Sequence, residues 1–203
     1  LSSVEPMDWS DDLLQLVADS PRIAKHVHIP LQSGSDTVLR RMHRKYRTRH
    51  FEERVRLARR LMPDAAIGAD VMAGFPGETA DEFGQTCNFI ESLPFTYLHV
   101  FPYSERPGTP AAAAISAQVP WQVRKERGRE LQIIGSRKNR EFRGGMVGRT
   151  LSGVTLQGGE ALTSNYLTVK LASPRPVRQM VDLEIGPVTD TGLCERQPFP
   201  VLA

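Results

Sequence analysis

Short β-like runs alternate with segments of helical periodicity over the first 143 residues of the chain. Strands that alternate with helices in this way pair in parallel, so the pattern predicts an α/β fold built from βα units. Four strands are expected, over residues 1–4, 26–31, 66–74 and 96–101. The helices expected after them cover residues 8–17, start near residues 35 and 51, start near residue 79, and cover residues 120–142. This part of the chain is predicted to be the later half of a parallel β/α barrel.

The character of the sequence changes after Gly144 and Gly145. Short β runs at residues 154–156, 166–169 and 181–185 are separated by glycine and proline turns, a pattern typical of a small barrel of about five strands. We therefore predict two domains, with residues 1–143 forming the barrel part and residues 144–203 a small all-β barrel.

Four βα units cannot close a parallel barrel alone. They would leave an exposed strand edge, which native proteins avoid, so we expect either further strands upstream of Leu1 or an edge-mediated dimer. We therefore interpret the chain as a fragment. It contains no run of 18 or more apolar residues and opens without an initiator Met or a leader, so we expect a cytoplasmic protein with no membrane partner.

The chain has two cysteines, Cys87 and Cys194, and they form no CxxC pattern. Neither a disulfide framework nor a local metal site is indicated by two thiols so far apart in sequence. Cys87 falls on the apolar face of an expected helix, where a small core residue is the better interpretation. We predict no metal ligands in this chain.

Polar side chains occupy one face of each expected strand. Because successive strand side chains point to opposite faces, Val27, Ile29 and Leu31 should share one face. The opposite faces collect His26, His28, Gln32, Asp70, Tyr97 and His99. Burying such groups is costly unless they are paired or hydrated, so a ligand-filled interior explains the pattern. For any single residue, a structural hydrogen bond is the alternative.

Polar and glycine-rich segments follow the expected strands: Glu5, residues 32–35, residues 74–79 and residues 103–109. Ligand sites of parallel α/β folds lie at the carboxyl ends of the strands. We therefore expect these four segments to meet at one rim.

The same segments resemble the radical-SAM methylthiotransferases that modify tRNA. The resemblance is closest to the branch that acts on N6-threonylcarbamoyladenosine beside the anticodon. It is carried by LSSVEP (1–6), HVHIPLQSGSD (26–36), MHRKY (42–46), DVMAGFPGET (70–79) and HVFPYSERPGTPA (99–111). The tail is similar to the small RNA-binding TRAM barrel that such enzymes append. The resemblance thus implies the later half of a radical-SAM barrel followed by a TRAM-like domain.

The resemblance also implies an activity for the whole protein. Such an enzyme cleaves S-adenosylmethionine reductively, abstracts a hydrogen from the adenine ring with the resulting radical, and inserts a methylated sulfur. The substrate would be a modified adenosine next to the anticodon of tRNA.

Seven residues would bind S-adenosylmethionine by this resemblance: Glu5, Gln32, Ser33, Arg44, Asp70, Gly74 and Phe75. The planar guanidinium of Arg44 can hold the methionyl carboxylate, and Asp70 can accept both ribose hydroxyls. Tyr103, Ser104 and Arg106 would face the substrate, with a stabilised turn as the alternative. No catalytic residue is identified.

One departure from the family concerns iron. Full-length members hold two 4Fe-4S clusters, one on a CxxxCxxC motif and one on three cysteines of an upstream domain. Neither set is present here, so we expect the fragment alone to be inactive.

The basic residues are concentrated in two segments. Residues 40–50 hold six Arg or Lys and no acid, and residues 120–143 hold eight against three acids. Such segments can follow the phosphates of tRNA, although a charged run is also typical of a solvated helix face.

Two other hypotheses remain open from the residues alone. The chain can be a cluster-free nucleoside- or RNA-binding module that kept the barrel loops without the radical chemistry. It can also be an ordinary half-barrel enzyme that uses Glu5, Asp70 and His99 as acid and base.

Overall fold

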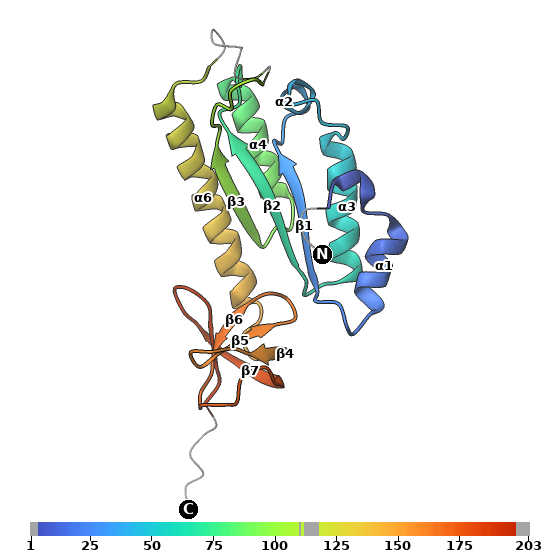
Figure 1. The fold of residues 1–203 in the computed structure, drawn as a ribbon, viewed down its shortest axis with the longest axis vertical. Helices are drawn as coiled ribbons and strands as arrows, with labels where there is room; N and C mark the ends of the chain where they lie inside the picture. Colours follow the sequence, from blue (N-terminus) through green and yellow to red (C-terminus); the bar gives the residue numbers. More distant parts are fainter. Residues whose placement is uncertain (1–3, 110, 112–117, 198–203) are drawn as a thin grey trace, which may run out of the picture.

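A three-stranded parallel sheet forms the centre of the larger part of the chain (Figure 1). The computed structural model describes residues 4–109, 111 and 118–197. The sheet contains β1 (His26–Gln32), β2 (Ala66–Ala73) and β3 (Tyr97–Pro102), in that order. Most of the first expected strand, over residues 1–4, lies outside the described residues. Among these three strands β1 and β3 are the edges, and the edge-mediated dimer stays a prediction.

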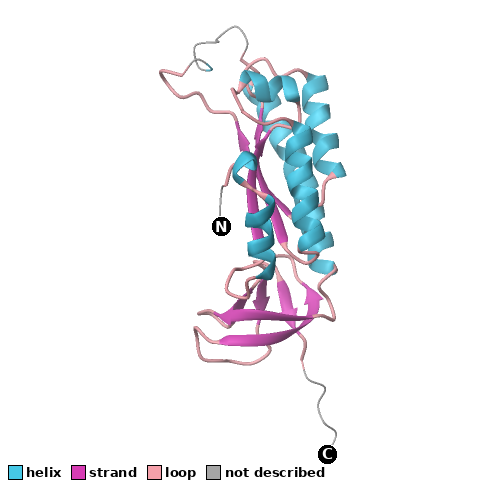
Figure 2. Cartoon of the chain, turned by 90° about the vertical axis from the view of Figure 1, so that its right-hand side faces the viewer, coloured by secondary structure: helices cyan, strands magenta, loops and turns pink. Residues whose placement is uncertain are grey.

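Most of the helices lie on one side of this sheet (Figure 2), and α1 and α4 begin at residues whose side chains cap them. Ser10 accepts from Leu13 N before α1, and Thr79 forms a capping box with Glu82 before α4. The α3 helix begins three residues before the predicted Phe51, because Asp36 Oδ1 accepts from Thr48 N and supports an earlier start. The helical elements are η1 (Pro6–Asp8), α1 (Asp11–Asp19), α2 (Asp36–Arg41), α3 (Thr48–Leu61), α4 (Ala80–Ser92) and α6 (Trp121–Gly144).

The predicted alternation of strand faces is confirmed. Val27, Ile29 and Leu31 of β1 are fully buried in the main hydrophobic core, together with Ile67 and Val71 of β2. The opposite face of the sheet carries the histidines of β1 and the polar residues of β2 and β3. This face of the sheet is therefore a polar wall, and no helix of the described residues lies over it.

The tail forms a closed five-stranded β-barrel, as predicted. Its strands are β4 (Thr150–Thr155), β5 (Glu160–Thr163), β6 (Thr168–Lys170), β7 (Met180–Val188) and β8 (Leu193–Glu195), closed in the order β4-β5-β6-β8-β7. The sequence pattern missed β5 and β8, which are four and three residues long and too short to show a clear alternation. A separate hydrophobic cluster around Leu183 and Val169 fills the barrel.

The small barrel contacts the parallel sheet at the amino ends of β1 and β2 (Figure 1). The Tyr166 ring stacks on His26, the first residue of β1, with ring centroids 4.2 Å apart. Asn165 Nδ2 donates to Asp64 O at 2.9 Å, just before β2. The guanidinium of Arg143, at the end of α6, donates to three carbonyls of the β7–β8 turn. The boundary between residues 143 and 144 stays a prediction, since α6 continues to Gly144.

Across the described parts of the chain, no helix combines the length and the apolar character needed to span a membrane.

Gly68 provides a test of the polar face. A Cβ at this position would lie 2.0 Å from Cζ of Tyr97, whose ring rests on Gly68 and whose hydroxyl lies 2.6 Å from His26 Nε2. We expect Gly68→Ala to displace this ring and lower the free energy of unfolding by about 1–3 kcal/mol. Urea denaturation measures the change.

Gly84→Ala is the matched control, because a Cβ at Gly84 in the middle of α4 would meet nothing within 4 Å. It should raise the free energy of unfolding by roughly 0.5–1 kcal/mol. A Gly68→Ala variant as stable as the original chain would show that the Tyr97 ring is not fixed there.

Candidate functional site

Two adjoining cavities open at the carboxyl ends of the strands, where the sequence places its glycine-rich loops. Their volumes are about 440 Å³ and about 560 Å³. The loop after β2 lines the first cavity and the loop after β3 lines the second. Both are lined by Gln32, Arg44, Met72, Thr109 and Ala111. The segments that follow β1, β2 and β3 therefore meet at one rim, as the parallel topology predicts.

Gln32 reaches both cavities because β1 ends in an irregular turn. Its φ is 65°, and the register between β1 and β2 shifts between Pro30 and Gln32. A left-handed φ is uncommon for a residue with a side chain and is held here by its surroundings. Ser33, the next residue, is fully buried, and its hydroxyl lies 3.2 Å from Thr86 Oγ1. Ser33 therefore ties the loop to α4 and does not line either cavity.

Arg44 is positioned by a buried tyrosine. The Tyr46 hydroxyl donates to the carbonyls of Pro30 and Leu31 at 2.8 and 3.0 Å, so the segment after α2 is fixed against the end of β1. Burial raises the pKa of Tyr46, which keeps this donor protonated. Arg44 Nη1 donates to Glu5 Oε1 at 2.8 Å. Glu5 thus joins the site through Arg44, beside the two cavities.

The turn after β2 is stabilised by a buried carboxylate. Gly74 has a φ of 76°, and its N–H donates to Glu78 Oε2 at 2.9 Å. Arg127 of α6 donates to the same oxygen at 2.7 Å. Burial raises the pKa of the Glu78 carboxyl, and these two donors oppose that shift. Phe75, next in the turn, lies edge-on to Tyr103 with ring centroids 5.6 Å apart.

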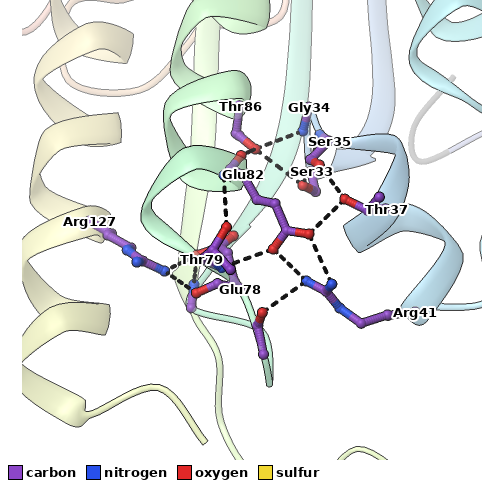
Figure 3. A network of polar contacts seen from close by, with 12 residues as sticks. Ser33, Gly34, Ser35, Thr37, Arg41, Glu78, Thr79, Glu82, Thr86 and Arg127 are labelled. Carbon is purple, nitrogen blue, oxygen red and sulfur yellow. Dashed lines mark hydrogen bonds and ion pairs between the residues drawn. The ribbon is translucent and has the colours of Figure 1, made fainter. Parts of the chain in front are cut away.

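Glu82 connects α4 to α2, as Figure 3 shows. Its carboxylate accepts from Thr37 at 2.7 Å and from two nitrogens of Arg41 at 2.9 and 2.7 Å. Arg41 also donates to Gly77 O at 3.2 Å and lines the first cavity. The hydrogen bonds from Arg41 are the largest influence on Glu82 and lower the pKa of its carboxyl to about 2. This network therefore joins α2, α4 and the loop after β2 in the wall of the first cavity.

The loop after β3 lines the second cavity with Tyr103, Ser104 and Arg106. Tyr103 is buried, its N–H donates to Ala73 O at 2.8 Å, and Arg124 lies over its ring at 5.7 Å. Ser104 and Arg106 are exposed. All three residues predicted to face the substrate thus line one cavity, with the tyrosine as a fixed wall.

Asp70 lies on the polar face of β2, three residues before the end of the strand, and does not line either cavity. Its Oδ1 is 3.1 Å from His28 Nε2 and 3.3 Å from His99 Nδ1. Burial lowers the pKa of His28, and Asp70 opposes that shift. Of the predicted cofactor residues, the structure brings together Gln32, Arg44 and Phe75, with Glu5 alongside. Gly74 shapes the turn.

Several cavity residues were missed from the sequence. They are Arg41, Met42, His43, Met72 and Ala111, whereas Pro76, Gly77 and Thr109 belong to segments that were predicted to form the rim. A signal existed for Met72, which lies two residues after Asp70 and therefore on the same face of β2.

Many basic side chains of the two segments form ion pairs with acidic residues of the same chain. In α6, Arg124, Arg127 and Arg137 pair with Glu105, Glu78 and Glu91, respectively. In residues 40–50, Arg41 and Arg44 pair with Glu82 and Glu5. The exposed cations of these segments include Arg40, Lys45, Lys125 and Arg129.

The cysteines do not fit an iron–sulfur cluster. Cys87 belongs to the hydrophobic core, as predicted, and burial raises the pKa of its thiol to about 12. Cys194 lies in β8 of the small barrel. Two cysteines cannot supply the three or four thiolates that a 4Fe-4S cluster uses.

We expect Glu82→Gln to lower the free energy of unfolding by about 1 kcal/mol at pH 7, because the amide loses the charged hydrogen bonds from the partly exposed Arg41. The pKa of this carboxyl falls from 4.5 to about 2 in the folded state, so its contribution is complete above pH 4.5 and is lost toward pH 2. The difference in free energy of unfolding between the original chain and Glu82→Gln should therefore become smaller as the pH falls from 4.5 toward 2. Urea denaturation at several pH values measures it.

Glu53→Gln is the control for this prediction, since Glu53 makes an exposed pair with Arg49 on α3. That change should cost less than about 0.5 kcal/mol. A Glu82→Gln effect that is equally large at every pH would contradict the role given to the carboxylate.

Comparison with known proteins agrees with the architecture. Residues 1–90 match the Radical SAM superfamily. The solved structure of the radical SAM enzyme coproporphyrinogen III oxidase (HemN) from Escherichia coli aligns with a TM-score of 0.56 and 18% identity. The alignment covers 68% of this chain and 32% of that chain. The predicted radical-SAM fold is therefore confirmed.

Three curated relatives share higher identity. A tRNA-2-methylthio-N(6)-dimethylallyladenosine synthase of Thermobifida fusca is 41% identical over 77% of this chain. The threonylcarbamoyladenosine tRNA methylthiotransferases MtaB of Aquifex aeolicus and Bacillus subtilis are 35% and 43% identical over 89% and 70% of it. The alignments span 32%, 44% and 31% of these relatives, respectively, so the chain corresponds to less than half of each. The chain therefore carries part of a radical SAM domain and is homologous to the tRNA methylthiotransferases.

Proposed function

We propose that this chain is part of an enzyme that adds a methylthio group to a modified adenosine next to the anticodon of tRNA. The observation that carries the proposal is the pair of adjoining cavities at the strand ends, which share Gln32 and Arg44. A methylthiotransferase has to bring a nucleoside cofactor and an RNA base together, and two adjoining cavities with shared lining residues suit that requirement. The names of the curated relatives support the same reaction. We favour threonylcarbamoyladenosine as the substrate base.

We propose S-adenosylmethionine as the occupant of the first cavity. Its volume of about 440 Å³ lies in the range of small-molecule sites. Arg44 supplies a guanidinium for the carboxylate, Gln32 supplies an amide, and Phe75 with Met72 supplies an apolar surface for the adenine. Glu5 can accept from the ammonium group of the methionyl end. We propose that Ser33 and Gly74 hold the loops that form the cavity. Asp70 does not line the cavity, so it can contact the cofactor only from the polar face of the sheet.

The second cavity is proposed to receive the substrate adenosine. Ser104 and Arg106 are exposed there and can contact the nucleotide or its phosphates, while Tyr103 forms a rigid wall. S-adenosylmethionine, once cleaved, supplies the radical chemistry of this family. The residues of this chain bind and orient the two partners.

We propose that two 4Fe-4S clusters belong to the whole protein and that their cysteines lie outside this chain. The 203-residue chain alone is then expected to be inactive. We further propose a cytoplasmic location, where tRNA is found, and no membrane partner. We also propose that residues 144–203 form a TRAM-like RNA-binding domain.

Mass spectrometry of tRNA nucleosides tests the proposed function. A strain lacking the gene should lose a methylthio-adenosine from its tRNA, and the complete gene should restore it. Accumulation of threonylcarbamoyladenosine would identify the favoured branch, whereas accumulation of dimethylallyladenosine would correct the substrate. An unchanged nucleoside profile would overturn the proposal.

A substitution at Arg44 tests the cofactor assignment separately. In the complete protein, Arg44→Gln should weaken S-adenosylmethionine binding about tenfold or more, because a charged hydrogen bond to the carboxylate is lost. Isothermal titration calorimetry measures the affinity.

Arg56→Gln is the control, since Arg56 makes only an exposed pair with Glu52 on α3. It should leave the affinity unchanged. Equal affinity in all three proteins would remove Arg44 from the cofactor site.

A further inference from the structure

Three side chains with metal-binding atoms converge on the polar face of the sheet, one from each strand. They are His28 of β1, Asp70 of β2 and His99 of β3. Although the sequence predicts no metal ligands, we propose that these three residues bind one divalent transition-metal ion, with zinc as the ion that fits best. This site does not depend on the proposed function.

The register of the sheet creates the convergence. His99 is the direct partner of Asp70 across β2 and β3, and His28 pairs with Gly68, two residues before Asp70 on the same face. Each residue offers one ligand atom, and the three atoms lie within 4.8 Å of one another. The sheet therefore holds all three on a rigid backbone, which a metal site requires.

The two distances to the Asp70 carboxylate suit a tetrahedral ion. Asp70 Oδ1 lies 3.1 Å from His28 Nε2 and 3.3 Å from His99 Nδ1. A zinc ion with bonds of about 2.0–2.2 Å separates neighbouring ligand atoms by roughly 3.4 Å. A small adjustment of the side chains would bring them to coordination distance, with the fourth position left for water.

One contact within the cluster is poorly aligned for a hydrogen bond. His28 Nε2 is buried and lies 3.1 Å from Asp70 Oδ1, but the ring N–H is not directed along this contact. A purely structural histidine would direct this nitrogen along a hydrogen bond, since a buried polar atom without one costs about 1–3 kcal/mol. A metal ion between the nitrogen and the carboxylate would satisfy both, because each donates a lone pair to it.

An ion can reach the site from solvent. The His99 side chain is 54% exposed and that of Asp70 is 20% exposed, whereas that of His28 is 7% exposed. Within the described residues, no helix covers this face of the sheet (Figure 2). Two imidazoles and one carboxylate suit zinc and other first-row divalent ions, whereas magnesium and calcium prefer oxygen ligands alone.

Zinc titration tests the proposal on the untagged 203-residue chain after removal of metal with a chelator. Calorimetry should show one Zn²⁺ per chain. His99→Ala should weaken binding at least tenfold, and circular dichroism should show unchanged folding because His99 is exposed. Asp70→Asn, which keeps the size of the side chain, should weaken binding to a similar extent.

His50→Gln is the matched control, since His50 lies on α3 on the other side of the sheet. It should bind zinc like the original chain. The proposal is overturned if the original chain binds no zinc, if His99→Ala and Asp70→Asn both keep its affinity, or if His50→Gln loses as much affinity as they do.

Discussion

The alternation of side chains along three parallel strands is the constraint on which the rest of the structure depends. The odd positions of β1, such as Val27 and Ile29, enter the core beneath the helices, and the even positions face the other way. A shift of one residue would bury the histidines in the apolar core and expose the aliphatic side chains. Because that exchange is so costly, the same pattern that builds the core also fixes where the polar groups collect.

The rim above this wall is held by charged groups that are paired within the protein. Glu78 and Glu82 each accept from a backbone N–H and from an arginine, so the loop after β2 is fastened to α6 and α4 is fastened to α2 (Figure 3). Buried carboxylates are tolerated only with such partners. The pairing also explains why much of the basic character of the chain is used in packing. The barrel lies at the opposite end of the strands, so within this chain RNA contacts from the barrel and from the rim would be far apart (Figure 1).

The sequence was sufficient for the elements whose signals are local. The alternation in β1 and β2, the start of α4 near residue 79, and the long helix before Gly144 were all predicted, because each depends on neighbouring residues. The radical-SAM fold and the relationship to tRNA methylthiotransferases followed from motifs in a fixed order.

The parts that were not predicted depend on contacts distant in sequence. Nothing near Asp70 indicates that His28 and His99 meet its carboxylate, because the strand register decides this. Arg41 is held in the cavity wall by Glu82, on another helix, and by the carbonyl of Gly77. Ser33 belongs to a cofactor motif by resemblance, yet its hydroxyl is directed toward Thr86 inside the protein.

We propose that the rim of the polar face holds the nucleoside cofactor. A crystal structure of the complete protein with its clusters and S-adenosylmethionine tests this most directly. The expected result is a cofactor molecule in contact with Gln32, Arg44 and Phe75, with its adenine against the apolar wall. A cofactor bound elsewhere, with this cavity filled by protein side chains, would contradict the claim.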